Sequence, residues 1–182
     1  MLLRIFIILI TVLLFPLMIF ISLLIFIEDG LPIFFKQKRI GINKYSFTIF
    51  KFRTMKKNTG DIPTHLLQNR NSFITNIGYF LRKLSLDELP QLFNIILGDM
   101  TLIGPRPALY NQKDLIDLRE EKGIHSLKPG LTGWAQVNGR DEISIRKKVD
   151  FDYYYLKNKN LFLDIRIFFL TIYKVLFRKD VS

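Results

Sequence analysis

The sequence has no cysteine and only two histidines, and these shortages exclude two kinds of site. Without cysteine there can be no disulfide scaffold and no thiolate-bound metal, and a reducing cytoplasmic face is compatible with the chain. His65 and His125 lie far apart, so a histidine-rich zinc site can be set aside. The 182 residues are enough for one domain with a modest hydrophobic core.

Acidic residues are also scarce relative to basic ones. Lysine and arginine total 27 against 16 acids, which gives a formal charge of +11. Such an excess indicates an acidic partner, which can be a nucleic acid, a phosphorylated substrate or an anionic membrane surface. The sequence contains no recognised nucleic-acid-binding module, so we expect no nucleic-acid partner.

Charge is absent from residues 5–27, which read IFIILITVLLFPLMIFISLLIFI. This run can cross a bilayer, and no small-residue cleavage site follows it, so we expect a retained membrane segment. Pro16 removes one helical hydrogen bond near its middle. The segment can therefore be a kinked single-pass helix or a re-entrant helix-break-helix hairpin. The basic residues that follow indicate a cytoplasmic location for the next segment in either case.

Residues 32–55 predict two short strands around a turn at Gly41 and Asn43. Extended geometry points Lys51 and Arg53 to the same face, as a solvated edge or as a paired anion grip. Apolar residues then recur at helical spacing from residue 73 to residue 84, and Gly98 is a plausible end for the helix that follows.

Adjacent carboxylates stand in the stretch LRKLSLDELPQLFN, residues 81–94. Ser85 and Glu88 have the spacing of a capping box. Pro90 conflicts with that box, because it falls where the helix needs a backbone donor. Either the helix begins at Asp87 or its first turn is irregular.

The setting of the acid pair favours ionised carboxylates, since both lie at a positive helix end near Arg82 and Lys83. An ionised aspartate such as Asp87 can act as a nucleophile. Its neighbour Glu88 can hold Mg²⁺, which prefers carboxylates and substrate phosphates. From this stretch alone, a helix cap remains the simpler interpretation.

Two later loops carry further candidates. Arg106 lies between Pro105 and Pro107, so it is either a rigidly held phosphate ligand or an exposed arginine on a stiff turn. Residues 128–142 are rich in glycine, which allows backbone to approach a ligand closely. Trp134 within them is expected to pack in the core or at an interface.

The C-terminal residues 161–179 predict an amphipathic helix that lies on a membrane surface, with packing on the protein's own core as the alternative. Its apolar face is expected to contain Leu161, Ile165, Phe168, Phe169, Ile172 and Leu176, and its polar face Asp164, Thr171, Lys174 and Arg178.

Read together, the motifs KFRTM, LRKLSLDELPQLFN, GDMTLIGPRP, KPGLTGWAQVNGR and DYYYLKN resemble the bacterial sugar transferase family, the small monotopic polyprenyl-phosphate phosphoglycosyl transferases. The resemblance spans about residues 16–175. It implies transfer of a sugar-1-phosphate from a UDP-sugar to polyprenyl (undecaprenyl) phosphate, with release of UMP. It implies a location on the cytoplasmic face of the bacterial inner membrane and a role in starting capsule, lipopolysaccharide, exopolysaccharide or glycoprotein glycan synthesis.

The resemblance also assigns roles to residues. Asp87 is implied as the nucleophile of a ping-pong reaction, and Glu88 as a ligand of the cofactor Mg²⁺. The phosphate-binding and substrate-binding candidates are Lys51, Arg82, Arg106, Arg140, Gln136 and Asn138. Asp152 matches a family aspartate, with a helix cap or a metal role as alternatives.

The expected fold is α+β and mainly helical, with a membrane-embedded segment over residues 1–29 and a catalytic domain over residues 30–182. The family breaks its re-entrant helix at a Ser-Pro pair, whereas this chain has Phe15 before Pro16. The alternative function is a non-enzymatic, membrane-anchored basic adaptor that binds anionic lipid or a partner glycan enzyme.

Overall fold

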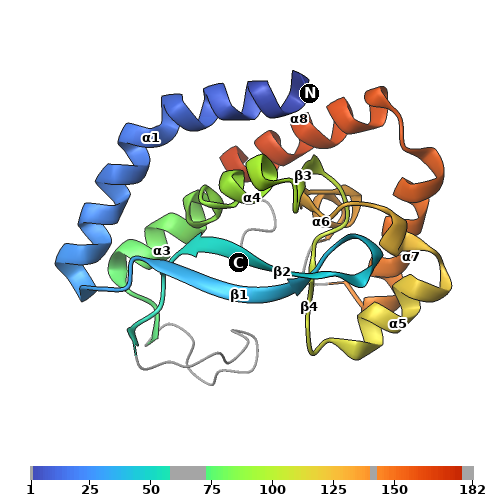
Figure 1. The fold of residues 1–182 in the computed structure, drawn as a ribbon, viewed down its shortest axis with the longest axis horizontal. Helices are drawn as coiled ribbons and strands as arrows, with labels where there is room; N and C mark the ends of the chain where they lie inside the picture. The colour runs from blue at the N-terminus through green and yellow to red at the C-terminus, as the bar shows by residue number, and fades with distance from the viewer. Residues whose placement is uncertain (1, 58–72, 140–142, 178–182) are drawn as a thin grey trace. The chain divides into compact units, whose positions relative to one another are not determined.

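The computed structural model describes residues 2–57, 73–139 and 143–177. Helices predominate in them, accompanied by two small sheets (Figure 1), which confirms the predicted mainly helical α+β class. The chain forms two compact units, Met1–Lys36 with Phe50–Leu92, and Gln37–Ile49 with Phe93–Val181. The predicted boundary between residues 29 and 30 stays a prediction.

The first unit begins with α1, which spans Leu2–Asp29 and continues through Pro16. Figure 1 shows α1 bending between its ends, as expected for a helix that lacks one backbone donor. The Thr11 hydroxyl donates to the Ile7 carbonyl at 2.7 Å, a back-bond that also favours bending. Within the described residues, α1 is the one helix long and apolar enough to cross a membrane.

Helix α3, Asn76–Lys83, confirms the helix predicted after residue 73. Its N-terminus is capped twice. The Thr75 hydroxyl accepts from the Gly78 amide at 2.9 Å. The Glu28 carboxylate, near the end of α1, accepts from the Asn76 and Ile77 amides at 2.7 and 3.0 Å. A carboxylate at a helix N-terminus is favourable, so these bonds fix α3 to the end of α1.

The predicted hairpin is confirmed. Strands β1, Phe34–Ile40, and β2, Ser46–Phe52, flank a short 3-10 turn in which Asn43 has a positive φ of 50°. Strand β4, Ala108–Leu109, pairs antiparallel with β1 and gives the order β2-β1-β4. A second sheet pairs β3, Thr101–Ile103, in parallel with β5, Gly130–Thr132.

Helix α4, Gln91–Leu97, ends as predicted at Gly98, whose φ is 94°. The Gly98 amide donates to the Ile95 carbonyl at 3.1 Å, and the Asp99 amide donates to the Asn94 carbonyl at 3.0 Å. This pair of bonds is a Schellman motif, which satisfies the last carbonyls of the helix.

The remaining helices of the second unit surround two hydrophobic clusters. One cluster centres on Ile103, Tyr155 and Ile167, and the other on Ala108, Leu115 and Val149. Trp134 packs against the first cluster and stacks on Tyr154 with 5.7 Å between ring centres, which confirms its predicted packing role. The helices are α5 (Lys113–Glu121), α6 (Trp134–Val137), α7 (Ile145–Asn158) and α8 (Leu161–Phe177).

Helix α8 uses its two faces differently. Leu163 and Ile167 are buried, and the polar residues beside them join the packed face. Asp164 accepts from the Tyr155 hydroxyl at 2.7 Å, and Thr171 contacts the Thr132 hydroxyl at 2.7 Å. The predicted apolar face is exposed in all six of its members: Leu161, Ile165, Phe168, Phe169, Ile172 and Leu176. The helix therefore packs through a narrow face that includes two residues of the predicted polar face, and the predicted packing of the apolar face on the core is wrong. The position of that exposed apolar face on a membrane surface stays a prediction.

Candidate active site

The acid pair lies on a 3-10 turn, Leu86–Glu88, between α3 and α4. Ser85 precedes it with a left-handed φ of 54°, and its side chain makes no capping hydrogen bond. Helix α4 starts at Gln91, directly after the buried Pro90. The capping box is therefore wrong and the irregular first turn is confirmed, because Pro90 cannot donate inside a helix but can precede one.

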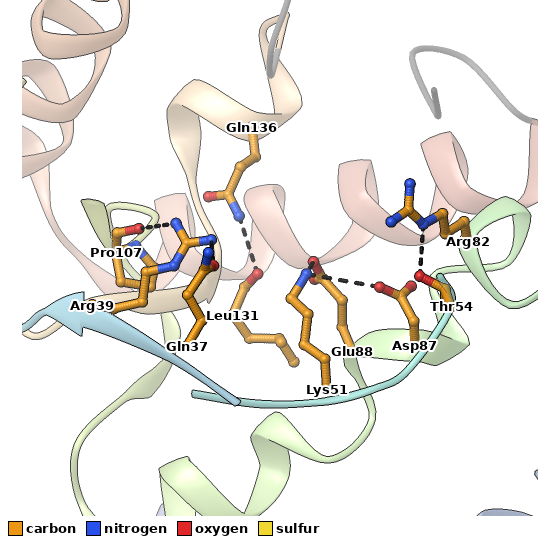
Figure 2. A network of polar contacts seen from close by, with 10 residues as sticks. All are labelled: Gln37, Arg39, Lys51, Thr54, Arg82, Asp87, Glu88, Pro107, Leu131 and Gln136. Atoms are coloured by element: carbon orange, nitrogen blue, oxygen red, sulfur yellow. Dashed lines mark hydrogen bonds and ion pairs between the residues drawn. The ribbon is translucent and has the colours of Figure 1, made fainter. Parts of the chain in front are cut away.

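Lys51 holds the two carboxylates together (Figure 2). Its ammonium lies 2.7 Å from Glu88 Oε1 and 3.7 Å from Asp87 Oδ2. The side chains of Lys51, Asp87 and Glu88 are 16, 13 and 12% exposed. The two carboxylates thus share one cation, which offsets part of their charge, and remain partly accessible, which suits groups that meet a charged substrate.

Arg82 is oriented by Thr54, a residue that sequence reasoning did not single out. Arg82 Nε donates to the Thr54 hydroxyl at 2.8 Å (Figure 2). The Thr54 carbonyl accepts from the Thr75 amide at 3.1 Å, and a Cβ on Gly78 would lie 2.2 Å from that carbonyl. The close approach of α3 to Thr54 requires glycine at residue 78. This contact fixes the start of α3, the helix that carries Arg82.

Arg53 does not join Lys51 in an anion grip, so that interpretation is wrong. Its guanidinium lies 2.9 Å from the Asp29 carboxylate and donates to the Gly30 carbonyl at 2.8 Å. The side chain is buried at the C-terminal end of α1, where a cation is favourable. Lys51 on β2 and Arg53 just beyond its end thus pair with different carboxylates.

In the second unit, the loop that presents Arg106 is fixed by its backbone. Gly130, Arg119 and Arg39 donate to three consecutive carbonyls, those of residues 105, 106 and 107, at 2.9, 2.8 and 3.0 Å. Figure 2 shows the last of these bonds. Both prolines are buried, whereas Arg106 is half-buried. The loop is therefore more rigid than its prolines alone would make it, as expected for a group that binds without reorganisation.

A buried ion pair supports this loop. Arg119 donates to Asp152 Oδ2 from Nε at 3.0 Å and from Nη2 at 2.6 Å, and its Nη1 bonds the Arg106 carbonyl. Asp152 lies inside α7 and is 1% exposed, so a helix-cap role is wrong. Burial raises the pKa of the Asp152 carboxyl, and the Arg119 guanidinium opposes that rise.

The glycine-rich segment packs on the chain's own backbone. A Cβ on Gly130 would lie 2.1 Å from the Gly104 nitrogen, and one on Gly133 would lie 2.0 Å from the Gly104 oxygen. These two glycines therefore allow two loops to approach each other. The amide nitrogens of Gln136 and Asn138 bond carbonyls within the segment at 3.0 and 2.7 Å. Their substrate roles stay predictions, and Arg140 lies outside the described residues.

The carboxylates of the acid turn are the candidate ligands for Mg²⁺. Across residues 2–57, 73–139 and 143–177, no group of three or more histidine, aspartate or glutamate side chains is placed to hold a metal. Mg²⁺ is commonly held by one or two carboxylates together with substrate phosphates. Asp87 and Glu88 fit a site of that kind, which substrate would complete.

Residues 2–178 match the family described as "Bacterial sugar transferase". The chain is 45% identical over 158 residues to an uncharacterized sugar transferase, EpsL, of Bacillus subtilis, which covers 86% of this chain and 76% of that protein. It is 40% identical over 166 residues to the UDP-N-acetylgalactosamine-undecaprenyl-phosphate N-acetylgalactosaminephosphotransferase of Aeromonas hydrophila.

A third relative is the UDP-glucose:undecaprenyl-phosphate glucose-1-phosphate transferase of Xanthomonas campestris, 40% identical over 174 residues. The matches cover 88 and 91% of this chain but only 39 and 36% of the Aeromonas and Xanthomonas proteins. The family match and the long match to EpsL lead to one conclusion. The chain belongs to the bacterial sugar transferase family of enzymes.

Proposed function

We propose that this chain transfers a sugar-1-phosphate from a UDP-sugar to polyprenyl phosphate, such as undecaprenyl phosphate, and releases UMP. The observation that carries the proposal is the Asp87–Glu88 pair on its 3-10 turn, with Lys51 between the carboxylates. The names of the Aeromonas and Xanthomonas relatives support the substrate classes, since both name undecaprenyl phosphate and a UDP-linked sugar.

The proposed reaction has two balanced steps. An Asp87 carboxylate oxygen attacks the phosphorus that bears the sugar, the bond to the bridging oxygen breaks, and UMP leaves with that oxygen. The product is a covalent phosphosugar on Asp87. An oxygen of polyprenyl phosphate then attacks the same phosphorus, the carboxylate leaves, and a polyprenyl-diphospho-sugar forms.

The basic residues supply fixed positive charge for this chemistry. Lys51 already pairs with both carboxylates, and a substrate phosphate would compete for its ammonium. Arg82 and Arg106 are proposed phosphate ligands, each supported by a partner that fixes its backbone or its guanidinium. Glu88 would hold Mg²⁺ when it is bound, and the ion would then supply positive charge to the donor diphosphate.

We place the protein on the cytoplasmic face of the bacterial inner membrane, anchored by α1. A re-entrant α1 would return both ends of the chain to the cytoplasm. The bend in α1 and its continuation through Pro16 suit either a re-entrant or a tilted helix. A tag at residue 1 would be accessible from the cytoplasm if α1 is re-entrant, and from the periplasm if it spans the membrane.

UMP release from a set of UDP-sugars tests the reaction, with purified protein, polyprenyl phosphate and Mg²⁺. We expect the wild type to release UMP with at least one sugar, and Asp87→Asn to release none. Asp117→Asn is the matched control, because Asp117 is an exposed carboxylate on α5. Full turnover by Asp87→Asn would contradict the assignment. Salt-sensitive liposome binding without any UMP release would favour the adaptor.

A further inference from the structure

An open apolar groove of about 300 Å³ lies between α1 and α3 in the first unit. Its volume is at the lower end of the range for ligand sites. The residues on its two walls recur at helical spacing, so each wall is one face of a helix. The walls include Leu17, Phe20 and Leu24 from α1, and Ile77, Phe80 and Leu81 from α3.

The groove leads toward the acid pair. The Glu28 carboxylate ties the end of α1 to the start of α3, and Figure 1 shows the two helices running apart from that junction. Leu86, just beyond α3, also lines the groove. The next residue along the chain is Asp87, whose carboxylate lies beside Lys51.

The lining identifies the chemistry of an occupant. Asn76 is the one polar residue among the nine that line the groove. Phe20 and Phe80, on its rim, are 57 and 56% exposed. Apolar surface of this kind favours a hydrocarbon over water, and the groove offers few partners for a polar ligand.

We propose that this groove binds the isoprene units of the acceptor lipid that lie nearest its phosphate. The inference rests on the proposed function. The phosphate and the chain of polyprenyl phosphate are covalently joined, so a phosphate that attacks at Asp87 brings its first isoprene units close to the 3-10 turn, where Leu86 lines the groove. The groove begins there and continues between two apolar helix faces, so it positions the acceptor as well as retaining it.

A tryptophan in the groove wall tests this inference. Leu24→Trp places a large side chain in the groove, and Leu23→Trp is the matched control, because Leu23 is the next residue of α1 and is 54% exposed. Displacing about two buried methylene groups should raise the KM for undecaprenyl phosphate about tenfold in Leu24→Trp. We expect the KM for the UDP-sugar to change by less than about twofold in both variants.

The outcomes separate the inference from the proposed function. No UMP release by the wild type would overturn the proposed function. An active wild type with an unchanged acceptor KM in Leu24→Trp would overturn the groove assignment alone. An equal rise in KM for Leu23→Trp would also overturn it, because the effect would then come from general membrane packing.

Photolabelling gives an answer that does not depend on a folded variant. A polyprenyl phosphate with a photoreactive group on its first isoprene unit should label wild-type peptides that contain residues 17–24 or 77–86. Excess undecaprenyl phosphate should remove the label, and excess phospholipid should not. Equal competition by phospholipid, or label confined to other peptides, would overturn the proposal.

Discussion

Two cation–carboxylate pairs, one in each unit, show how similar groups can serve different ends. Lys51 and Glu88 are 16 and 12% exposed, whereas Arg119 and Asp152 are 4 and 2% exposed. The first pair joins strand β2 to the 3-10 turn that follows the left-handed residue Ser85, and the second joins α5 to α7 and supports the Arg106 loop. The difference teaches that accessibility separates a pair available to substrate from a pair that supports the fold.

The largest expected effect comes from breaking the buried pair. Arg119→Met leaves the Asp152 carboxylate buried without its partner and removes a donor from the Arg106 carbonyl. We expect a loss of about 3–5 kcal/mol in unfolding free energy, measured by denaturant unfolding in detergent. Arg119→Met with Asp152→Leu should recover part of this loss. No destabilisation by the single variant would contradict a structural role.

Lys51→Met should have the opposite effect, a large loss of activity with a smaller loss of stability. Its loss of unfolding free energy should be smaller than that of Arg119→Met, because the Lys51–Glu88 pair keeps more contact with solvent than the Arg119–Asp152 pair. Its kcat/KM for UMP release should fall about 100-fold or more, since fixed charge at the phosphate is lost. Lys122→Met is the control, because Lys122 forms an exposed ion pair with Asp150 in the second unit. A large stability loss with normal kcat/KM would reverse the comparison between the two pairs.

The smallest expected effect is the pH dependence of stability caused by His125, whose pKa is influenced by the Arg119 cation of the buried pair. Burial lowers the pKa of its imidazole, the hydrogen bond to the Ile116 carbonyl opposes this, and the Arg119 cation adds to it. A lowered folded pKa means that the unfolded state binds the proton more readily, so stability should fall as the pH drops below about 6.5. His125→Gln should reduce this slope in melting temperatures measured between pH 7.5 and 5.5. An unchanged slope would contradict the burial argument.

Local patterns in the sequence predicted the elements well. The uncharged run, the turn at Gly41 and Asn43, and the helix end at Gly98 all depend on neighbouring residues, and the structure confirms each. Backbone preferences act over a few residues, so they can be read directly. The family could also be predicted, because several motifs occur together in order.

Side-chain partners were harder to predict, because they come from distant parts of the chain. Lys51 and Glu88 are 37 residues apart, and Arg119 and Asp152 are 33 apart. The local spacing of Ser85 and Glu88 suggested a capping box, but tertiary contact with Lys51 and the position of Pro90 decided otherwise. The role of Arg53 was predicted wrongly for a similar reason. Strand alternation does not reveal that its partner is the Asp29 carboxylate at the end of α1.

The central claim is that Asp87 becomes covalently phosphorylated by the sugar donor, and intact-protein mass spectrometry tests it most directly. Wild-type protein treated with the active UDP-sugar and Mg²⁺, without acceptor, should gain the mass of one phosphosugar. Peptide mapping should place the adduct on Asp87, and undecaprenyl phosphate should discharge it. Asp87→Asn should gain no mass. An adduct on another residue, or its persistence in Asp87→Asn, would contradict the account.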